Sequence, residues 1–162
     1  MRKFIASMLL CASLAQFAAA QRTDKIIIQG NPAGTQTVQS EAGGVRAEYS
    51  YNDRGRGDHI IATWKVDAAG LPIEYQGRGN DYMKASVEER FELKDGRANW
   101  KSRGEEGAQE VTGAAFYLPL NAPPEILGVL ARALLKAIDH KLALLPAGEA
   151  RIEGAGKVKV AE

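Results

Sequence analysis

The 162-residue sequence predicts a mainly β protein, an antiparallel meander of about seven or eight strands that forms a curved sheet or partial barrel, with one amphipathic helix packed on it. Several short segments alternate apolar and polar residues with the period of two that half-buried strands require. Most of the 17 glycines fall between these segments, where the chain must turn. One stretch changes to the three- and four-residue spacing of a helix. The order of segments shows no βαβ alternation.

Residues 1–20 are expected to be a signal peptide. The segment begins with Arg2 and Lys3, continues with an apolar run and ends in AAA, small residues that suit signal peptidase. The run is short for a membrane anchor and lacks a basic stop. A lipoprotein signal would use Cys11, but Leu10 before it is not the small residue required. The protein is therefore expected to be exported, periplasmic or secreted, with no stable membrane anchor after cleavage.

Residues 21–162 are expected to form a single β-rich domain. Without Arg2 and Lys3 the 21 basic residues become 19 against 20 acidic ones, so the net charge is about −1. Nucleic-acid-binding proteins usually carry a basic stripe, so no nucleic-acid partner is expected. No cysteine remains after cleavage, so the core must hold the fold without disulfides. This composition fits a bacterial periplasm better than a eukaryotic secretory route.

The first strands are expected in the stretch that ends at residue 67. DKIIIQG (24–30) predicts a strand, NPAGT (31–35) a turn, and QTVQS a strand that pairs back. VRAEYSY (45–51) and DHIIATWKVD (58–67) then alternate cleanly. Their predicted core positions are Val45, Ala47, Tyr49, Tyr51, Ile60, Ala62, Trp64 and Val66.

The alternation continues through LPIEYQ (71–76), SVEERFELK (86–94) and ANWKSR (98–103). The tight connections DAAG and DGR separate these strands, and a further strand is expected near AFYLPL (115–120). Glu89 is a charged misfit on an otherwise apolar face. The predicted core positions are Leu71, Ile73, Tyr75, Val87, Phe91, Leu93, Ala98, Trp100 and, as a polar member, Ser102.

A helix is predicted over about residues 123–139. Paired prolines precede it, and prolines are tolerated in a first helical turn. LALLPAGEARIEGAGKVKV (142–160) returns to turn and strand, and alternation continues to the end of the sequence. This abrupt ending predicts that the domain is an incomplete N-terminal portion of a longer protein. The helix positions expected to face the sheet are Ile126, Val129, Leu130, Ala133, Leu134, Ala137 and Ile138.

The sequence offers little catalytic apparatus. Metal sites need clustered ligands, whereas His59 on a strand and His140 at the helix end each lack a second histidine nearby. His140 is expected to lie favourably at the helix C-terminus. No serine occurs in a G-x-S-x-G context. The pairs Glu88–Glu89 and Glu105–Glu106 should point to opposite strand faces as solvated residues. We therefore predict no catalytic, cofactor-binding or metal-binding residue in this chain.

Two arginine–glycine segments, YNDRGRGDHI (51–60) and EYQGRGNDYM (74–83), are candidates for a docking or anion-binding loop. Their glycines allow positive φ, so backbone N–H groups would form a concavity beside the arginines. The favoured alternative is a pair of structural strand connections whose arginines bind nearby aspartates. The segments are expected at different ends of the sheet. The candidate residues are Arg54, Arg56 and Arg78, with Gly55, Gly57, Gly77 and Gly79.

Seven segments together resemble the amino-terminal region of exported bacterial amidohydrolase-family proteins of the imidazolonepropionase-like type. They are GNPAGTQTV, YNDRGRGDHI, DAAGLP, GNDYMKASVEERF, WKSRGEEG, FYLPLNAPPE and LALLPAGEARIE, in that order within residues 24–153. The resemblance implies that a hydrolase domain follows, a TIM barrel that uses zinc or another divalent metal to act on carbon–nitrogen bonds. It also implies metal ligands in the barrel, namely an H-x-H pair, further histidines, an aspartate and often a modified lysine. His59 and His140 match none of these, so no catalytic residue is carried over.

Three functions of different classes follow. The first is a non-catalytic accessory module whose partner is the hydrolase domain of the parent protein. The second is a stand-alone periplasmic module that binds a small apolar ligand between the helix and inward-facing aromatic residues, unless these residues simply form the core. An enzyme that uses Asp53, Arg54 and Arg56 ranks last. The aromatic residues concerned are Tyr49, Tyr51, Trp64, Tyr75, Phe91 and Trp100.

Overall fold

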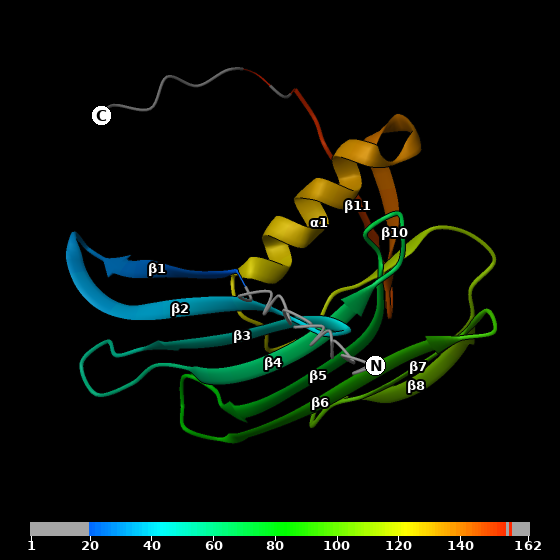
Figure 1. Ribbon diagram of the computed structural model, residues 1–162. Helices are drawn as coiled ribbons and strands as arrows, with labels where there is room; N and C mark the ends of the chain where they lie inside the picture. The colour runs from blue at the N-terminus through cyan, green and yellow to red at the C-terminus, as the bar shows by residue number, and fades with distance from the viewer. Residues whose placement is uncertain (1–19, 155, 157–162) are drawn as a thin grey trace, which may run out of the picture.

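The computed structural model describes residues 20–154 and 156 (Figure 1). The predicted signal peptide, except for Ala20, and the alternating end GKVKVAE, except for Gly156, lie outside the described residues. The predictions made for those segments therefore stay predictions.

Eight strands form one antiparallel sheet in which each strand pairs with its neighbours in sequence, so the predicted meander is confirmed. The sheet curves around a helix that lies against one of its faces (Figure 1). The strands are β1 (Gln21–Ile28), β2 (Asn31–Glu41), β3 (Gly44–Tyr51), β4 (His59–Val66), β5 (Pro72–Asn80), β6 (Ser86–Lys94), β7 (Arg97–Lys101) and β8 (Glu106–Glu110).

The turn between β1 and β2 comes earlier than predicted. Gln29 and Gly30 make it, with φ values of 50° and 80°. Two successive positive φ angles are typical of the two-residue turns that match the twist of paired strands. The NPAGT segment therefore lies inside β2 and is not a turn. Pro32 is tolerated there because pairing of β2 with β3 begins only at Gly34.

A second layer follows the meander. It contains β9 (Ala115–Tyr117), α1 (Glu125–Lys136), a 3-10 turn η1 (Ile138–His140), β10 (Lys141–Leu145) and β11 (Glu149–Arg151). Strands β9 and β10 pair in parallel, so β9, α1 and β10 form a βαβ unit that the sequence did not reveal. The reason is that β9 has three residues, all buried, and therefore shows no alternation. No helix in the described part of the chain has the length and apolar character needed to cross a bilayer.

Helix α1 is shorter than the predicted span of 123–139. It begins after Pro124 and ends at Lys136, because the next residue, Ala137, has an extended backbone with φ of −69° and ψ of 151°. Ile138, predicted to face the core, lies beyond this end and is 88% exposed. Val66, another predicted core residue, follows a register shift at the end of β4 and is 40% exposed.

The core lies between α1 and one face of the eight-stranded sheet, which we call the inner face. Most predicted core positions are buried there, so the alternation of the strands predicted their orientation correctly. The second layer supplies the opposing side chains. The buried sheet residues are Ala47, Ile60, Ala62, Trp64, Leu71, Tyr75, Val87, Phe91 and Ala98, and those of the second layer are Ala115, Phe116, Tyr117, Ile126, Val129, Ala133, Leu134, Leu142 and Leu145.

Candidate functional site

The first arginine–glycine segment forms a tight turn between β3 and β4. Arg54 and Gly55, with φ values of 53° and 86°, make its tip. Asp53 and Arg56 exchange two backbone hydrogen bonds of 2.6 and 3.1 Å across it. The Arg54 guanidinium donates to the Asp53 carboxylate at 3.1 Å, and the Gly55 N–H donates to the Asn52 side chain at 2.8 Å. The loop thus uses several of its own donors to hold its shape.

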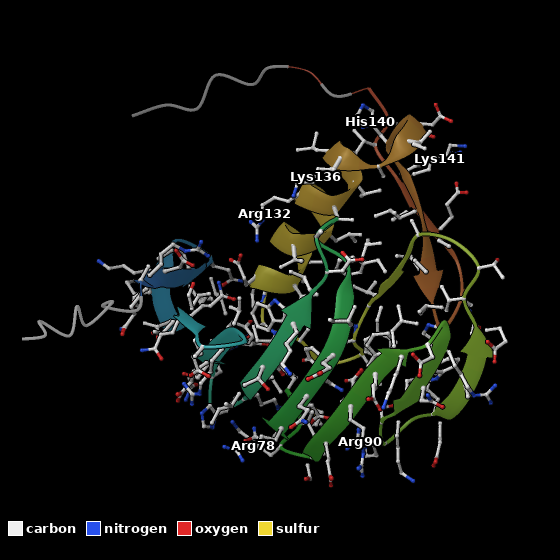
Figure 2. The ribbon with its side chains drawn as sticks, turned by 45° about the vertical axis from the view of Figure 1, so that its right-hand side comes forward. Arg78, Arg90, Arg132, Lys136, His140 and Lys141 are labelled. Carbon is white, nitrogen blue, oxygen red and sulfur yellow. The ribbon has the colours of Figure 1, made fainter. Side chains whose placement is uncertain are left out.

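The second segment meets the first at the same end of the sheet, so the expectation of different ends is wrong. The Gly57 N–H donates to the Tyr82 carbonyl at 3.4 Å, and the Lys84 ammonium donates to the Gly57 carbonyl at 3.0 Å. The reason is that β3, β4 and β5 are consecutive antiparallel strands, so the β3–β4 loop and the end of β5 lie at the same end of the sheet. Arg78 lies within β5 on the face turned away from α1 (Figure 2). Gly77 beside it lacks the positive φ that an anion-binding concavity would use.

The two histidines lie in different surroundings. On β4, the Nε2 atom of His59 is 3.3 Å from a Glu48 carboxylate oxygen. The Nδ1 atom of His140 lies 3.1 Å from the Leu134 carbonyl and donates to it at the end of α1, as the sequence predicted. Within the described ranges, no three His, Cys, Asp or Glu side chains gather as metal ligands.

Glu89 is a buried carboxylate with a structural role. Glu88 is exposed and Glu89 is 3% exposed, so the two point to opposite faces as predicted, but the expectation that both are solvated is wrong. One Glu89 oxygen accepts from the Tyr117 hydroxyl and the Leu120 N–H, each at 2.8 Å, and the other accepts from the Asn121 N–H at 3.1 Å. Burial and the nearby Glu89 raise the pKa of Tyr117, which keeps its hydroxyl a donor. Glu89 therefore fixes the segment that leads into α1.

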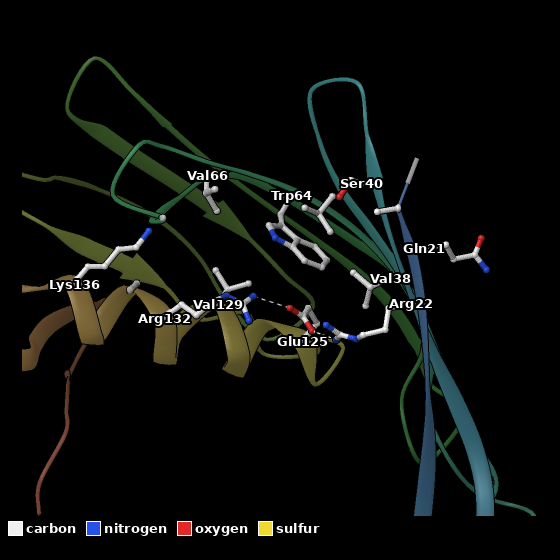
Figure 3. Close-up of a pocket in the computed structure, with 14 residues that line it drawn as sticks. Gln21, Arg22, Val38, Ser40, Trp64, Val66, Glu125, Val129, Arg132 and Lys136 are labelled. Atoms are coloured by element: carbon white, nitrogen blue, oxygen red, sulfur yellow. Dashed lines mark hydrogen bonds and ion pairs between the residues drawn. The ribbon is translucent and has the colours of Figure 1, made fainter. Parts of the chain in front are cut away.

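A groove of about 470 Å³ opens between α1 and the inner face of β1–β4, and we call it the α1 groove (Figure 3). Its floor is apolar and its sides carry charge. The apolar residues that line it include Val38, Val45, Trp64, Val66 and Val129, and the charged residues are Arg22, Glu125, Arg132 and Lys136.

A charged network ties the first turn of α1 to β1 and β2 beside this groove. The Glu125 carboxylate, 9% exposed, accepts from Arg132 at 2.7 Å and also from Arg22. The Glu125 N–H donates to the Gln36 side chain at 2.8 Å, and the Gln36 amide donates to Asp24 at 3.1 Å. Burial alone raises the pKa of Glu125, but the two arginines outweigh it and hold that pKa below its usual range.

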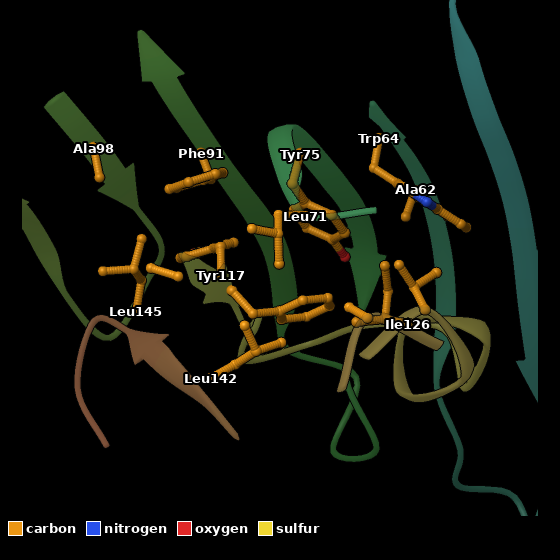
Figure 4. Close-up of a cluster of buried hydrophobic side chains, with 14 of the residues drawn as sticks. Ala62, Trp64, Leu71, Tyr75, Phe91, Ala98, Tyr117, Ile126, Leu142 and Leu145 are labelled. Carbon is orange, nitrogen blue, oxygen red and sulfur yellow. The ribbon is translucent and has the colours of Figure 1, made fainter. Parts of the chain in front are cut away.

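The inward aromatic residues that a ligand-binding module would use mostly form the core, which is the alternative that the sequence favoured. Tyr75 and Phe91 are 1% and 4% exposed. The Phe91 and Tyr117 rings stack with their centroids 4.2 Å apart, and Figure 4 shows Leu142 and Leu145 in the same cluster. The β5–β7 part of the inner face is thus filled, and the opening lies at the β1–β4 part.

Sequence reasoning singled out none of the charged residues of the α1 groove. A signal was present in the helix, because Glu125, Arg132 and Lys136 are spaced by seven and four residues and so share one side of it. Arg22 and Gln36 had no such signal, because their contacts with Glu125 span 103 and 89 residues.

Together, these features define a curved antiparallel sheet that is covered on its inner face by a βαβ unit, with an amphipathic groove beside α1. In comparisons with known proteins, no protein-family model matches the chain, and neither a curated protein nor a solved structure shows significant similarity to it.

Proposed function

We propose that the chain is a non-catalytic N-terminal module of an exported, metal-dependent hydrolase that acts on carbon–nitrogen bonds. Its role in this proposal is to pack against the hydrolase domain. The ordered resemblance of residues 24–153 to the leading region of imidazolonepropionase-like amidohydrolases supports the class of enzyme. Zinc or another divalent metal, with its ligands, would belong to the hydrolase barrel.

The surface that we expect to dock onto the hydrolase domain is an apolar stripe on the solvent side of α1, formed by Leu127, Ala131 and Leu135. Leu127 and Leu135 are each 62% exposed, and Ile138 beyond them is 88% exposed. Leu127, Ala131 and Leu135 follow one another at steps of four, so they lie along one side of the helix. An exposed apolar row of this kind is typical of a protein–protein contact. The tip of the β3–β4 loop, with Arg54 and Arg56, is a second candidate contact.

The gene sequence downstream of codon 162 gives the first test. We expect an in-frame continuation that encodes the H-x-H pair of a metal-dependent barrel. A stop codon in that position would contradict the proposal. So would hydrolysis of N-acyl amino acids or dipeptides by purified residues 21–162 supplied with zinc.

The docking surface is tested in the longer protein. The double substitution Leu127→Glu and Leu135→Glu places two charges on the stripe. It is expected to weaken the contact between module and barrel, so trypsin should cleave the chain between them faster. Leu120→Glu is the matched control, because Leu120 is also exposed (67%) but lies in the segment between β9 and α1, away from the stripe and the β3–β4 loop. Equal cleavage rates in the two variants would remove the stripe from the proposal.

A further inference from the structure

We propose that the α1 groove binds an amphipathic anion, a carboxylate that carries an unbranched alkyl chain. This inference goes beyond the accessory role, and it does not depend on it. The groove lies on the sheet side of α1, whereas the apolar stripe lies on the solvent side, so the same chain has room for both.

The floor of the groove suits an alkyl chain. Val38 and Val45 are only partly buried against the core, and Val66 is 40% exposed. These three side chains leave apolar surface facing the opening, and the largely buried Val129 and Trp64, 8% and 2% exposed, close the floor beneath them (Figure 3). The volume of about 470 Å³ lies within the range of roughly 300–1,000 Å³ that is typical of small-molecule sites. Burial of this surface by a chain of CH₂ groups would supply the binding energy.

The shape of the groove favours a linear ligand. It runs beside α1 from Glu125 to Lys136, which at the rise of a helix is a distance of about 16 Å. Figure 3 shows Arg22 near one end and Lys136 near the other. Gly70 lines the Lys136 end and has no side chain to close it.

The charges of the groove select an anion. Arg22, Arg132 and Lys136 supply three positive charges, and Glu125 is the one acidic side chain among the lining residues. Asp24 pairs with Arg22 at 3.0 Å beside the groove, so the local formal charge including Asp24 is +1. A cationic ligand would meet net repulsion here, and a neutral one would gain nothing from these residues.

Lys136 is the residue assigned to the ligand carboxylate. The guanidinium groups of Arg22 and Arg132 are engaged with Glu125. Lys136 forms no ion pair with another described residue, and its side chain is exposed at the groove. Its ammonium would donate a charge-assisted hydrogen bond to the carboxylate while the alkyl chain lies over Val129 and Trp64.

The test is a fluorescence titration with dodecanoate below its micellar concentration. The protein has two tryptophans, so Trp100→Phe leaves Trp64, on the groove floor, as the reporter. Saturable change of Trp64 emission is expected with dodecanoate, and dodecyltrimethylammonium is expected to bind at least about tenfold more weakly. Titration calorimetry on the protein with both tryptophans gives the same comparison if Trp100→Phe perturbs the fold.

Two charge reversals locate the site. Lys136→Glu is expected to weaken dodecanoate binding by about five- to tenfold. It should also reduce the difference in affinity between dodecanoate and dodecyltrimethylammonium. Lys141→Glu, the same change on β10 outside the groove, is expected to leave both affinities unchanged. The proposal is overturned if dodecanoate does not saturate, if the anion and the cation bind equally, or if the two variants behave alike. None of these outcomes bears on the hydrolase context, which is tested separately by the downstream gene sequence.

Discussion

At the scale of single residues, the glycines of the first arginine–glycine segment have different roles. Gly55 has a φ of 86° with open space where a Cβ atom would lie, whereas Gly57 has a φ of 143° and a Cβ atom there would lie 2.0 Å from the Tyr51 carbonyl oxygen. Gly55→Ala should therefore cost only the strain of a left-handed residue, about 1 kcal/mol. Gly57→Ala should cost at least about 3 kcal/mol, because two backbone segments must separate. Urea unfolding of both variants measures the difference, and equal losses would contradict this account.

Glu89 provides a second prediction at this scale. Glu89→Gln keeps the size of the side chain but turns an NH₂ group toward donors that now bond to a carboxylate, the Tyr117 hydroxyl and the N–H groups of Leu120 and Asn121. A loss of about 2–4 kcal/mol in the free energy of unfolding is expected. Glu88→Gln, one residue away on the exposed face, should change it by less than about 0.5 kcal/mol. A comparable loss in both variants would show that the buried hydrogen bonds contribute little.

For single residues, the sequence predicted the face to which a side chain points better than it predicted the residues that the side chain contacts. Alternation placed Glu89 on the inner face, yet nothing near it in the sequence identified Tyr117 or Leu120, because those contacts close loops of 28 and 31 residues. The charged groove residues were missed for the same reason. Local periodicity reports which way a side chain points, and a long-range contact also depends on how the elements pack.

At the scale of elements, strands β1–β7 of the meander were predictable, whereas β8 and the second layer were less so. Inner strands such as β4 and β6 have one face against the core and one toward solvent, which produces alternation, whereas β8 has no buried residue and shows none. β9 is buried throughout and short, so neither its pairing nor its direction was visible. The prediction of helix α1 was correct in type but too long, because the apolar spacing continues past the backbone break at Ala137.

The attachment of α1 to the sheet makes stability depend on pH. The pKa of Glu125 in the folded protein is below the ordinary value of about 4.3, so its ionised form stabilises the fold above that pH. This contribution is lost as the pH falls through the ordinary value toward the folded one. Glu125→Gln should lower the free energy of unfolding by about 1–3 kcal/mol at pH 7 and flatten its decline between about pH 5 and pH 3.

Chemical unfolding at a series of pH values measures this dependence. Glu92→Gln, on an exposed position of β6, is the matched control and should keep the slope of the parent protein. Parallel slopes for Glu125→Gln and the parent protein would show that the Arg22 and Arg132 bonds contribute little to stability.

At the scale of the whole molecule, the second layer covers the sheet unevenly. Ile60, Tyr75 and Phe91, on β4, β5 and β6, are each at most 4% exposed, and β9, α1 and β10 pack over this region. In contrast, the edge strands β1 and β8 contain no buried residue. A structure covered in this way should open from its edges before it unfolds globally, because edge strands have the least apolar contact to lose.

Native-state hydrogen exchange should therefore show two levels of protection. Paired amides of β4–β6 should exchange only through global unfolding, and those of β1 should exchange at least about 100-fold faster. The Gln36 side chain connects the edge of the sheet to α1, because it forms hydrogen bonds with both Asp24 on β1 and the first N–H of α1. Gln36→Leu should thus lower protection in β1, β2 and the first turn of α1 by about tenfold relative to β5 and β6. If protection fell equally in all strands, the edge and the centre would belong to one cooperative unit, and the α1 groove would be as rigid as the core beside it.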